Sequence, residues 1–302
     1  MNFADKYRKT LLIGLAFAVC GFLPLLMVPP CAHGAGKHCL WKVSDGNNAV
    51  YLLGSIHMLK KDAYPLDPII EQTFEKTSKL VLEVNLDEMN SQSAQQLMIK
   101  QGFLPSGTSI QDHLSKPSFD VIKEHLAPLG LNLEVIQRFK PWLLMLTMTV
   151  AKLQSLGYDP ANGIDNYFFD KAKERKKIIS ALESPDFQID LLDSLPPKTQ
   201  EAALLQTVKE LDTMEKEFDA IVKTWSSGDA EQLESTLLES FNEYPEVYEK
   251  VVIQRNQNWI PKIQELLREK GGTFVVVGAA HLIGERGVVS LLKQKGFSVE
   301  QQ

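Results

Sequence analysis

The chain has 302 residues, of which 44% are hydrophobic, so it can bury a full core as one large domain or two small ones. A formal net charge of -6 at pH 7 excludes the basic surface that recognition of nucleic acid phosphates needs. We therefore predict a globular protein that does not bind nucleic acid.

Residues 1–34 have the order of a secretory signal: basic residues, an apolar stretch over 11–28, then small residues. We expect cleavage near Gly34 and export to the periplasm or the medium. An uncleaved N-terminal membrane anchor is the alternative, because the stretch is just long enough to cross a bilayer. Of three cysteines only Cys39 lies outside this segment, which excludes an internal disulfide and a cysteine zinc site in the mature fold.

The next elements form a β-α-β pattern. Two strand-like runs, 40–43 and 49–53, flank a turn of Ser, Asp, Gly and Asn and predict a hairpin. Asp67 followed by a proline is a typical N-cap and first turn, so a helix follows. A strand over 80–86 completes the pattern.

The middle of the chain is mostly helical. Periodicity of 3.6 residues predicts helices at 118–127, 141–157, 163–175, 198–224, 229–240 and 245–270. A short strand at 177–181 interrupts them. After this region the β-α-β pattern returns, with a strand over 273–277, a helix whose last turn is basic and ends at glycine, and a strand over 297–300.

Both β-α-β halves open with Gly-x-x-His, at Gly54 to His57 and Gly278 to His281. A glycine closing a strand lets the backbone turn sharply and deliver the histidine at the strand's carboxyl end, where open α/β sheets bind ligands. We predict an α/β fold: a central mixed sheet from these two halves, with a large helical insertion at about 90–270, all within one domain over 35–302. An internal duplication is a hypothesis that unlike topologies of the halves would remove.

Two imidazoles in one crevice could bind a metal or exchange protons. A single histidine is usually structural, but two in matching strand settings favour a functional interpretation for His57 and His281. The 224 positions between them give no local metal-ligand spacing.

Two carboxylates accompany predicted strands. Glu83 lies within the strand over 80–86, where it is costly unless paired or metal-bound, although that face of the strand could instead be wet. Glu183 follows the strand at 177–181. Asp165 begins a predicted helix, and we interpret it as a residue that favours the helix dipole rather than as a catalytic one.

Arg255 and Asn256 fall on the apolar stripe of their predicted helix. A guanidinium facing inward needs an acidic or oxyanion partner; otherwise its stem packs there while its head reaches water. Pro261 should kink or restart this helix.

Seven segments together resemble the TraB/GumN family, whose wider group includes the Tiki metalloproteases and, more distantly, the erythromycin esterases and ChaN-like proteins. The similarity covers essentially the whole mature chain. It is carried by 40–43, 51–57, 80–84, 163–165, Leu182-Glu183 with Gln188, Arg255-Asn256 with Trp259, and 277–282. The first histidine motif has Ser55 where threonine is commoner in the family, which keeps the hydroxyl.

The resemblance implies that His57, Glu83, Arg255 and His281 occupy active-site positions, with Glu183 a lesser candidate. It also implies a divalent metal, manganese or cobalt, with zinc and iron as alternatives. We expect an exported metal-dependent hydrolase, a peptidase that acts on a peptide or amide bond. His57, His281 and Glu83 would hold the ion, Glu83 or Glu183 would be the general base, and Arg255 would stabilise the oxyanion.

Two alternatives follow from the same residues. In the first, one histidine paired to Glu83 is the general base without metal. In the second, the protein binds and sequesters a peptide or small signal on the same fold without turnover.

Overall fold

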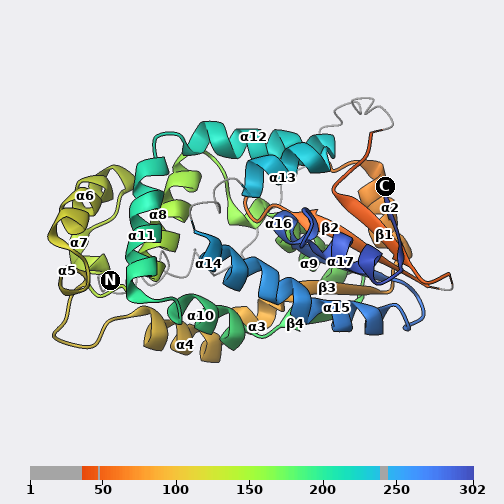
Figure 1. Cartoon of the computed structure of the whole chain (residues 1–302), viewed down its shortest axis with the longest axis horizontal. Coiled ribbons are helices and arrows are strands. Elements are labelled where there is room, and N and C mark those ends of the chain that lie inside the picture. Colours follow the sequence, from red (N-terminus) through yellow and green to blue (C-terminus); the bar gives the residue numbers. More distant parts are fainter. Residues whose placement is uncertain (1–35, 47, 239–243) are drawn as a thin grey trace.

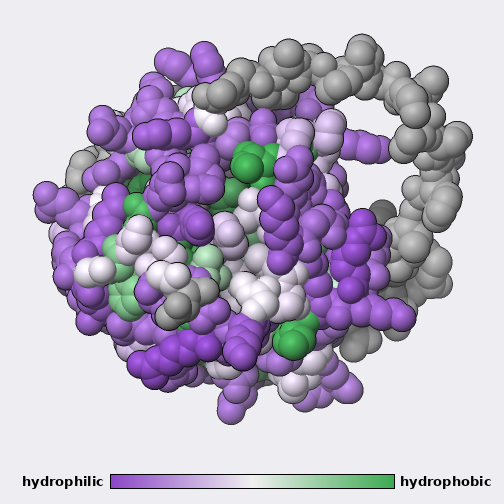
Figure 2. Space-filling model, turned by 90° about the vertical axis from the view of Figure 1, so that its right-hand side faces the viewer, coloured by the Kyte–Doolittle hydropathy of each residue, from purple (hydrophilic) through white to green (hydrophobic). Residues whose placement is uncertain are grey.

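The computed structural model describes residues 36–46, 48–238 and 244–302. The predicted signal, residues 1–34, lies outside the described residues. Within them, no helix has the length and apolar character that a membrane span requires. The end of the molecule shown in Figure 2 is mostly hydrophilic, with isolated hydrophobic side chains.

A six-stranded sheet forms one half of the molecule (Figure 1). Its strand order is β4-β3-β5-β2-β1-β6. The edge strand β6 and β2 both pair antiparallel with β1, and the pairs β2/β5, β5/β3 and β3/β4 are parallel. The strands are β1 (Leu40–Ser44), β2 (Ala49–Ser55), β3 (Lys79–Val84), β4 (Ile178–Glu183), β5 (Thr273–Gly278) and β6 (Ser298–Gln301). The predicted mixed sheet and the hairpin are confirmed.

Helices connect the strands in four groups. Between β2 and β3 lie the 3-10 turn η1 (Lys61–Ala63) and α2 (Pro68–Lys76). Between β3 and β4 lie α3 (Leu86–Met89), α4 (Gln92–Gly102), α5 (Ile110–His113), α6 (Lys116–Leu126), η2 (Ala127–Leu129), α7 (Leu133–Ile136), α8 (Pro141–Ser155), η3 (Pro160–Asn162) and α9 (Ile164–Glu174). Between β4 and β5 lie α10 (Pro185–Asp193), α11 (Pro197–Glu210), α12 (Met214–Ser227), α13 (Ala230–Leu238), α14 (Pro245–Tyr248), the π-helical segment η5 (Glu249–Ile253) and α15 (Gln254–Leu266). After β5 come α16 (Ala279–Leu282) and α17 (Val288–Gln294).

Helices cover both faces of the sheet. On one face Phe74 of α2 and Phe168 of α9 pack on Phe274 of β5, with ring centroids 5.0–5.5 Å apart. On the other face lie α15 and α17, which pack against each other in front of the sheet in Figure 1. Parallel strands covered in this way are expected to be apolar on both faces, and β5 is buried along its whole length.

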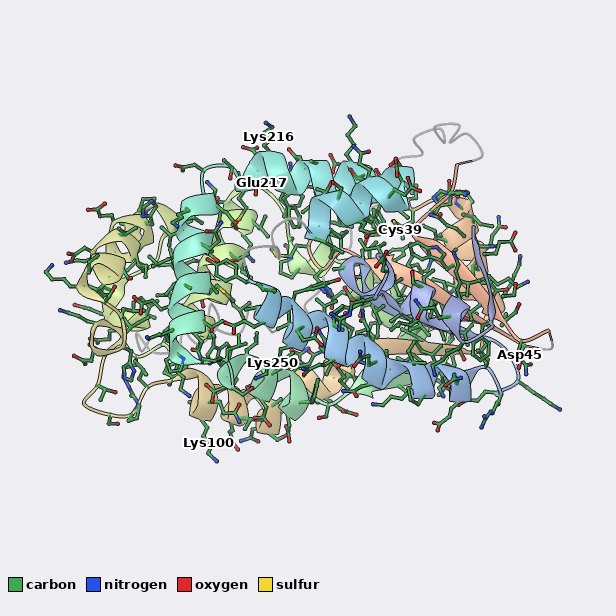
Figure 3. All side chains as sticks on the ribbon, viewed as in Figure 1. Cys39, Asp45, Lys100, Lys216, Glu217 and Lys250 are labelled. Atoms are coloured by element: carbon green, nitrogen blue, oxygen red, sulfur yellow. The ribbon has the colours of Figure 1, made fainter. Side chains whose placement is uncertain are left out.

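A second hydrophobic core lies in the helical half, to the left in Figure 1. It forms mainly among α6, α8 and α11, and its largest members include Trp142 and Phe139. Lys100 of α4 and Lys216 of α12 point outward on opposite edges of the molecule (Figure 3). The sheet and the helical half each have their own core. They meet at the carboxyl ends of β2, β3 and β5.

Three predictions about local structure need correction. The helix expected over 198–224 is two helices, because the chain turns at 211–213 between α11 and α12. Pro261 lies inside α15 and does not end it; the irregular backbone is the π-helical segment upstream, where one extra residue enters the turn. Neither Gly54 nor Gly278 adopts a positive φ, so they do not serve the sharp turn that we expected.

The two halves also have unlike topologies. The connection from β2 to β3 skips one strand, whereas that from β5 to β6 skips two in the opposite direction. This arrangement removes the hypothesis of an internal duplication. The two Gly-x-x-His motifs still end neighbouring strands, because β2 and β5 are paired in parallel with Ser55 opposite Gly278.

Candidate active site

The site lies at the carboxyl ends of three adjacent parallel strands. His57 follows β2, Glu83 lies near the end of β3, and His281 follows β5 on the short helix α16. Since β5 pairs with both β2 and β3, these three residues reach the same edge of the sheet. Arg255 approaches that edge from α15.

Gly278 marks the point where these groups meet. A Cβ atom built on it would lie 3.2 Å from Glu83 Oε1, 3.3 Å from His57 Nε2 and 3.6 Å from His281 Cδ2. The absence of a side chain at this position therefore leaves the space that the two imidazoles and the carboxylate face. At Gly54 the missing side chain lets the backbone of α16 approach β2, since a Cβ there would lie 3.2 Å from the Cα of Ala279.

Gly278→Ala places a methyl group in that space. We expect activity to fall by at least about tenfold, because a displacement of the reacting groups by about 1 Å is enough for a large loss. The change in unfolding free energy should stay near 1 kcal/mol, a usual cost for a single substitution. Parallel measurement of hydrolysis and of urea unfolding checks both parts; unchanged activity would contradict this placement of the site.

Asp165 holds His57. The Nδ1 atom of His57 lies 2.7 Å from Asp165 Oδ2, which also accepts a hydrogen bond from the Ser55 hydroxyl. Nδ1 therefore carries a proton, and Nε2 is the atom directed toward Gly278. The charge of Asp165 raises the pKa of His57 to about 9. Of the His57 side chain 61% is exposed, so the ring is accessible from outside.

His281 is held in a different way. Its Nδ1 lies 2.7 Å from Asn256 Oδ1, and the amide nitrogen of Asn256 donates to the Arg286 carbonyl, which fixes the orientation of the amide. Nδ1 of His281 is thus the donor, and Nε2 accepts from Arg255 Nη1 at 3.1 Å. The ring also packs on Trp259, with centroids 4.4 Å apart. Burial lowers the pKa of His281 to about 4, so this ring is neutral at pH 7.

Glu83 is buried and accepts hydrogen bonds on both oxygens. Oε1 accepts from the Gly278 backbone N–H at 2.6 Å, and Oε2 accepts from Arg255 Nη2. Burial by itself would raise the pKa of this carboxyl. Burial is the largest single effect, but the positive charge of Arg255, the neighbouring imidazoles and the Gly278 hydrogen bond together outweigh it and hold the pKa of Glu83 well below its usual range.

Arg255 connects Glu83, His281 and Glu183. Its Nε and Nη2 atoms donate to Glu183 at 2.7–3.2 Å, and Glu183 also accepts from Trp259 Nε1 at 2.8 Å and from Gln188 Nε2 at 3.1 Å. The π-helical segment immediately before α15 changes the helical phase one turn before Arg255. The guanidinium therefore faces inward to two carboxylates, and does not extend to water.

Sequence reasoning placed four residues at this site that the structure brings together: His57, Glu83, Arg255 and His281. Glu183 lies one step away, behind Arg255. Asp165 was interpreted as a helix-dipole residue, and this is corrected: it accepts from the first histidine. The signal was present, because Gly-Ile-Asp is one of the segments that carry the family resemblance.

The described residues contain no group of three or more His, Cys, Asp or Glu side chains already placed to hold a metal ion. The donor chemistry nevertheless suits a divalent cation. Both imidazoles have Nδ1 bound to an oxygen, which leaves Nε2 as the atom that a metal would bind. At His57, whose pKa is about 9, a metal would have to displace the Nε2 proton. Arg255 bonds to His281 and Glu83, so an ion held by both would require that guanidinium to withdraw.

Comparison with known proteins agrees with the resemblance seen in the sequence. Residues 39–301 match the model of the TraB/PrgY/gumN family. The uncharacterized Escherichia coli K12 protein YbaP is 24% identical over 262 residues, which cover 85% of this chain and 94% of YbaP. An uncharacterized protein of Treponema pallidum is 22% identical over 273 residues, covering 86% and 81%.

A more distant similarity extends to proteins named as proteases. Metalloprotease TIKI2 of Xenopus tropicalis is 23% identical over 315 residues, which cover 86% of this chain and 59% of that protein. Metalloprotease TIKI1 of Danio rerio is 22% identical over 303 residues, covering 83% and 60%. No solved structure matches the chain.

Proposed function

Because the chain belongs to the TraB/PrgY/gumN family, we propose that it is a metal-dependent hydrolase that cleaves a peptide or amide bond and acts outside the cytoplasm. The single observation that carries this proposal is the meeting of His57 Nε2, Glu83 Oε1 and the His281 ring around Gly278. The distant similarity to metalloprotease TIKI2 and the signal-like N-terminus support it.

His57, His281 and Glu83 would hold the ion. Manganese or cobalt follows from the family resemblance, and nitrogen and oxygen ligands without thiolate suit these metals as well as zinc or iron. When bound, a divalent ion supplies Lewis acidity and lowers the pKa of its water. Asp165 and Asn256 would keep each ring in the tautomer that presents Nε2.

Arg255 would stabilise the negative charge that develops on the carbonyl oxygen. Its guanidinium is already desolvated, and the bonds to Glu183 can hold it near the site while it leaves Glu83 for the substrate oxygen. Glu183 is bonded to Arg255, Trp259 and Gln188, and we therefore give it a positioning role in place of the general-base role.

Glu83, besides holding the ion, is the carboxylate left for proton transfer, through Oε2, the oxygen to which Arg255 is bonded. While Arg255 is bonded to it, its pKa lies well below the usual range, which makes it a weak base. Transfer of the guanidinium from Glu83 toward the substrate oxygen would raise the basicity of the carboxylate at the moment when a proton must be accepted.

The test is incubation of the wild-type protein with manganese and a library of peptides and acyl amides, with products identified by mass spectrometry. We expect cleavage that a chelator stops and manganese restores. Metal content after purification in chelator-free buffer gives a readout that is independent of activity. The double variant His57→Ala/His281→Ala should retain less metal than the His113→Ala control, whose histidine is exposed in the helical half. Equal metal content in both would contradict the proposed ligands.

A second candidate is a sequestering protein without turnover. It is favoured by the hydrogen bonds of Arg255 to His281 and Glu83, because they occupy two of the proposed ligands. In the same experiment, stoichiometric retention of peptides without cleavage would support this candidate and contradict the hydrolase.

A further inference from the structure

The site opens into a cavity of about 780 Å³. This volume falls within the roughly 300–1,000 Å³ range of pockets for small molecules. Ser55, His57, Glu83, Arg255 and His281 line the part formed by the sheet. The rest is lined by the helical half, so the cavity occupies the interface between the two cores.

The helical part of the wall is mostly hydrocarbon. It includes Leu146 and Val150 of α8, Ile136 of α7, Phe139, and Ile189 and Leu192 of α10. A wall of this kind binds apolar surface without regard to direction. The part of the substrate next to the reacting bond is therefore apolar.

Three polar side chains in this wall already donate within the protein. Thr147 and Thr149 of α8 donate their hydroxyl hydrogens to carbonyl oxygens four residues earlier in the same helix, at 2.7 and 3.0 Å. The amide of Gln188 donates to Glu183. A peptide placed against the hydrocarbon side chains would bury backbone N–H and C=O groups without partners there, which is unfavourable at each residue.

We infer that this cavity is an acyl-chain pocket, and that the substrate is an amide whose acyl side is a long unbranched hydrocarbon chain. This inference rests on the proposed function. Water adds to the amide carbonyl carbon, the C–N bond breaks, and the products are a fatty carboxylate and the protonated amine. No other reactant is needed.

Binding to the wild-type protein is tested with N-methylamides of saturated acids of 4 to 12 carbons, by titration calorimetry. We expect the dissociation constant to fall about threefold to fourfold with each added methylene until the cavity is filled, as for transfer of a CH₂ group out of water. Affinity that does not depend on chain length would overturn the inference. So would tighter binding of N-acetyl-trileucine N-methylamide than of an acyl amide of equal length, which would assign the cavity to apolar peptides.

Leu146→Trp narrows the pocket and should weaken binding of the 12-carbon amide at least tenfold while the 4-carbon amide is unaffected. Val150→Trp is a second variant with the same expectation. Ile99→Trp is the control, because Ile99 is exposed on α4 and does not line the cavity. Equal binding of the long amide by all of these proteins would contradict the assignment.

Turnover of the matching p-nitroanilides separates this inference from the proposed function. Binding that depends on chain length, without release of p-nitroaniline, would support the acyl-chain pocket and contradict the hydrolase function. Hydrolysis at a rate that does not depend on chain length would support the hydrolase function and contradict the acyl-chain pocket.

Discussion

Arg255→Met is expected to lower the free energy of unfolding at pH 7 by about 3–5 kcal/mol, the usual result of removing one partner from a buried ion pair. The guanidinium is bonded to both Glu83 and Glu183, and all three side chains are nearly inaccessible to water. Without it, two buried carboxylates lose their counter-charge. The loss is a large part of the about 5–15 kcal/mol that stabilises a typical domain.

The same variant should show a characteristic pH dependence. In the wild type the pKa of Glu83 is lowered, so the carboxylate contributes stability above its unfolded pKa of about 4.3 and loses it as the pH falls through the folded pKa. In Arg255→Met the counter-charge is lost, so burial raises the pKa of Glu83. The carboxylate then lowers the free energy of unfolding at pH 7, and this penalty is relieved as the pH falls and Glu83 takes up a proton. The stability difference from the wild type should therefore shrink between pH 7 and pH 5.

Urea unfolding at both pH values measures this effect. Arg175→Met is the matched control, because Arg175 forms an exposed pair with Glu75 and its loss should cost at most about 1 kcal/mol. Adding Glu83→Gln to Arg255→Met should restore part of the stability. An Arg255→Met variant no less stable than the Arg175→Met control would contradict the buried network.

His57→Ala is expected to reduce hydrolysis by at least about 10²–10⁴-fold, the range for loss of a positioned acid–base group, with a stability change below about 1 kcal/mol. The side chain is mostly exposed, and Asp165 keeps its hydrogen bond from Ser55. His113→Ala should change neither quantity. Initial rates on a cleaved peptide and thermal unfolding measure the two effects.

His281→Ala should differ from His57→Ala in stability. Its ring is buried against Trp259 and bonded on both nitrogens, so its removal leaves a cavity and an unpaired Asn256 oxygen. We expect the same loss of activity together with a clear loss of stability. A large stability loss in His57→Ala would instead indicate a structural role for that histidine.

The sequence predicted much of the scaffold because its strands and helix starts depend on local chemistry. The Asp67 side chain accepts from Ile69 N–H at the start of α2, as expected of an N-cap. The strands that carry the two Gly-x-x-His motifs also lie where the apolar runs are. Strand ends and helix starts are short-range features, so a single sequence is enough to find them.

The role of Asp165 could not be predicted in the same way. An aspartate in the first turn of a helix is favourable by itself, so the sequence offers a sufficient local reason for it. Only the approach of the strand carrying Ser55 to α9 gives this carboxylate its two partners. The direction of Arg255 was open for a similar reason, since a long cationic side chain on an apolar stripe can reach water or a buried acid.

By itself, the sequence determined which residues are chemically exceptional: two histidines at strand ends and a few charges where apolar residues are expected. The tertiary structure decided what those residues do to one another, because β5 lies between β2 and β3 and its Gly278 N–H binds Glu83, 195 positions earlier in the chain. The cavity, too, could be seen only in the tertiary structure. Side chains that look like ordinary helix core in the sequence line an open space, because the helical half packs beside the sheet and leaves its strand ends uncovered.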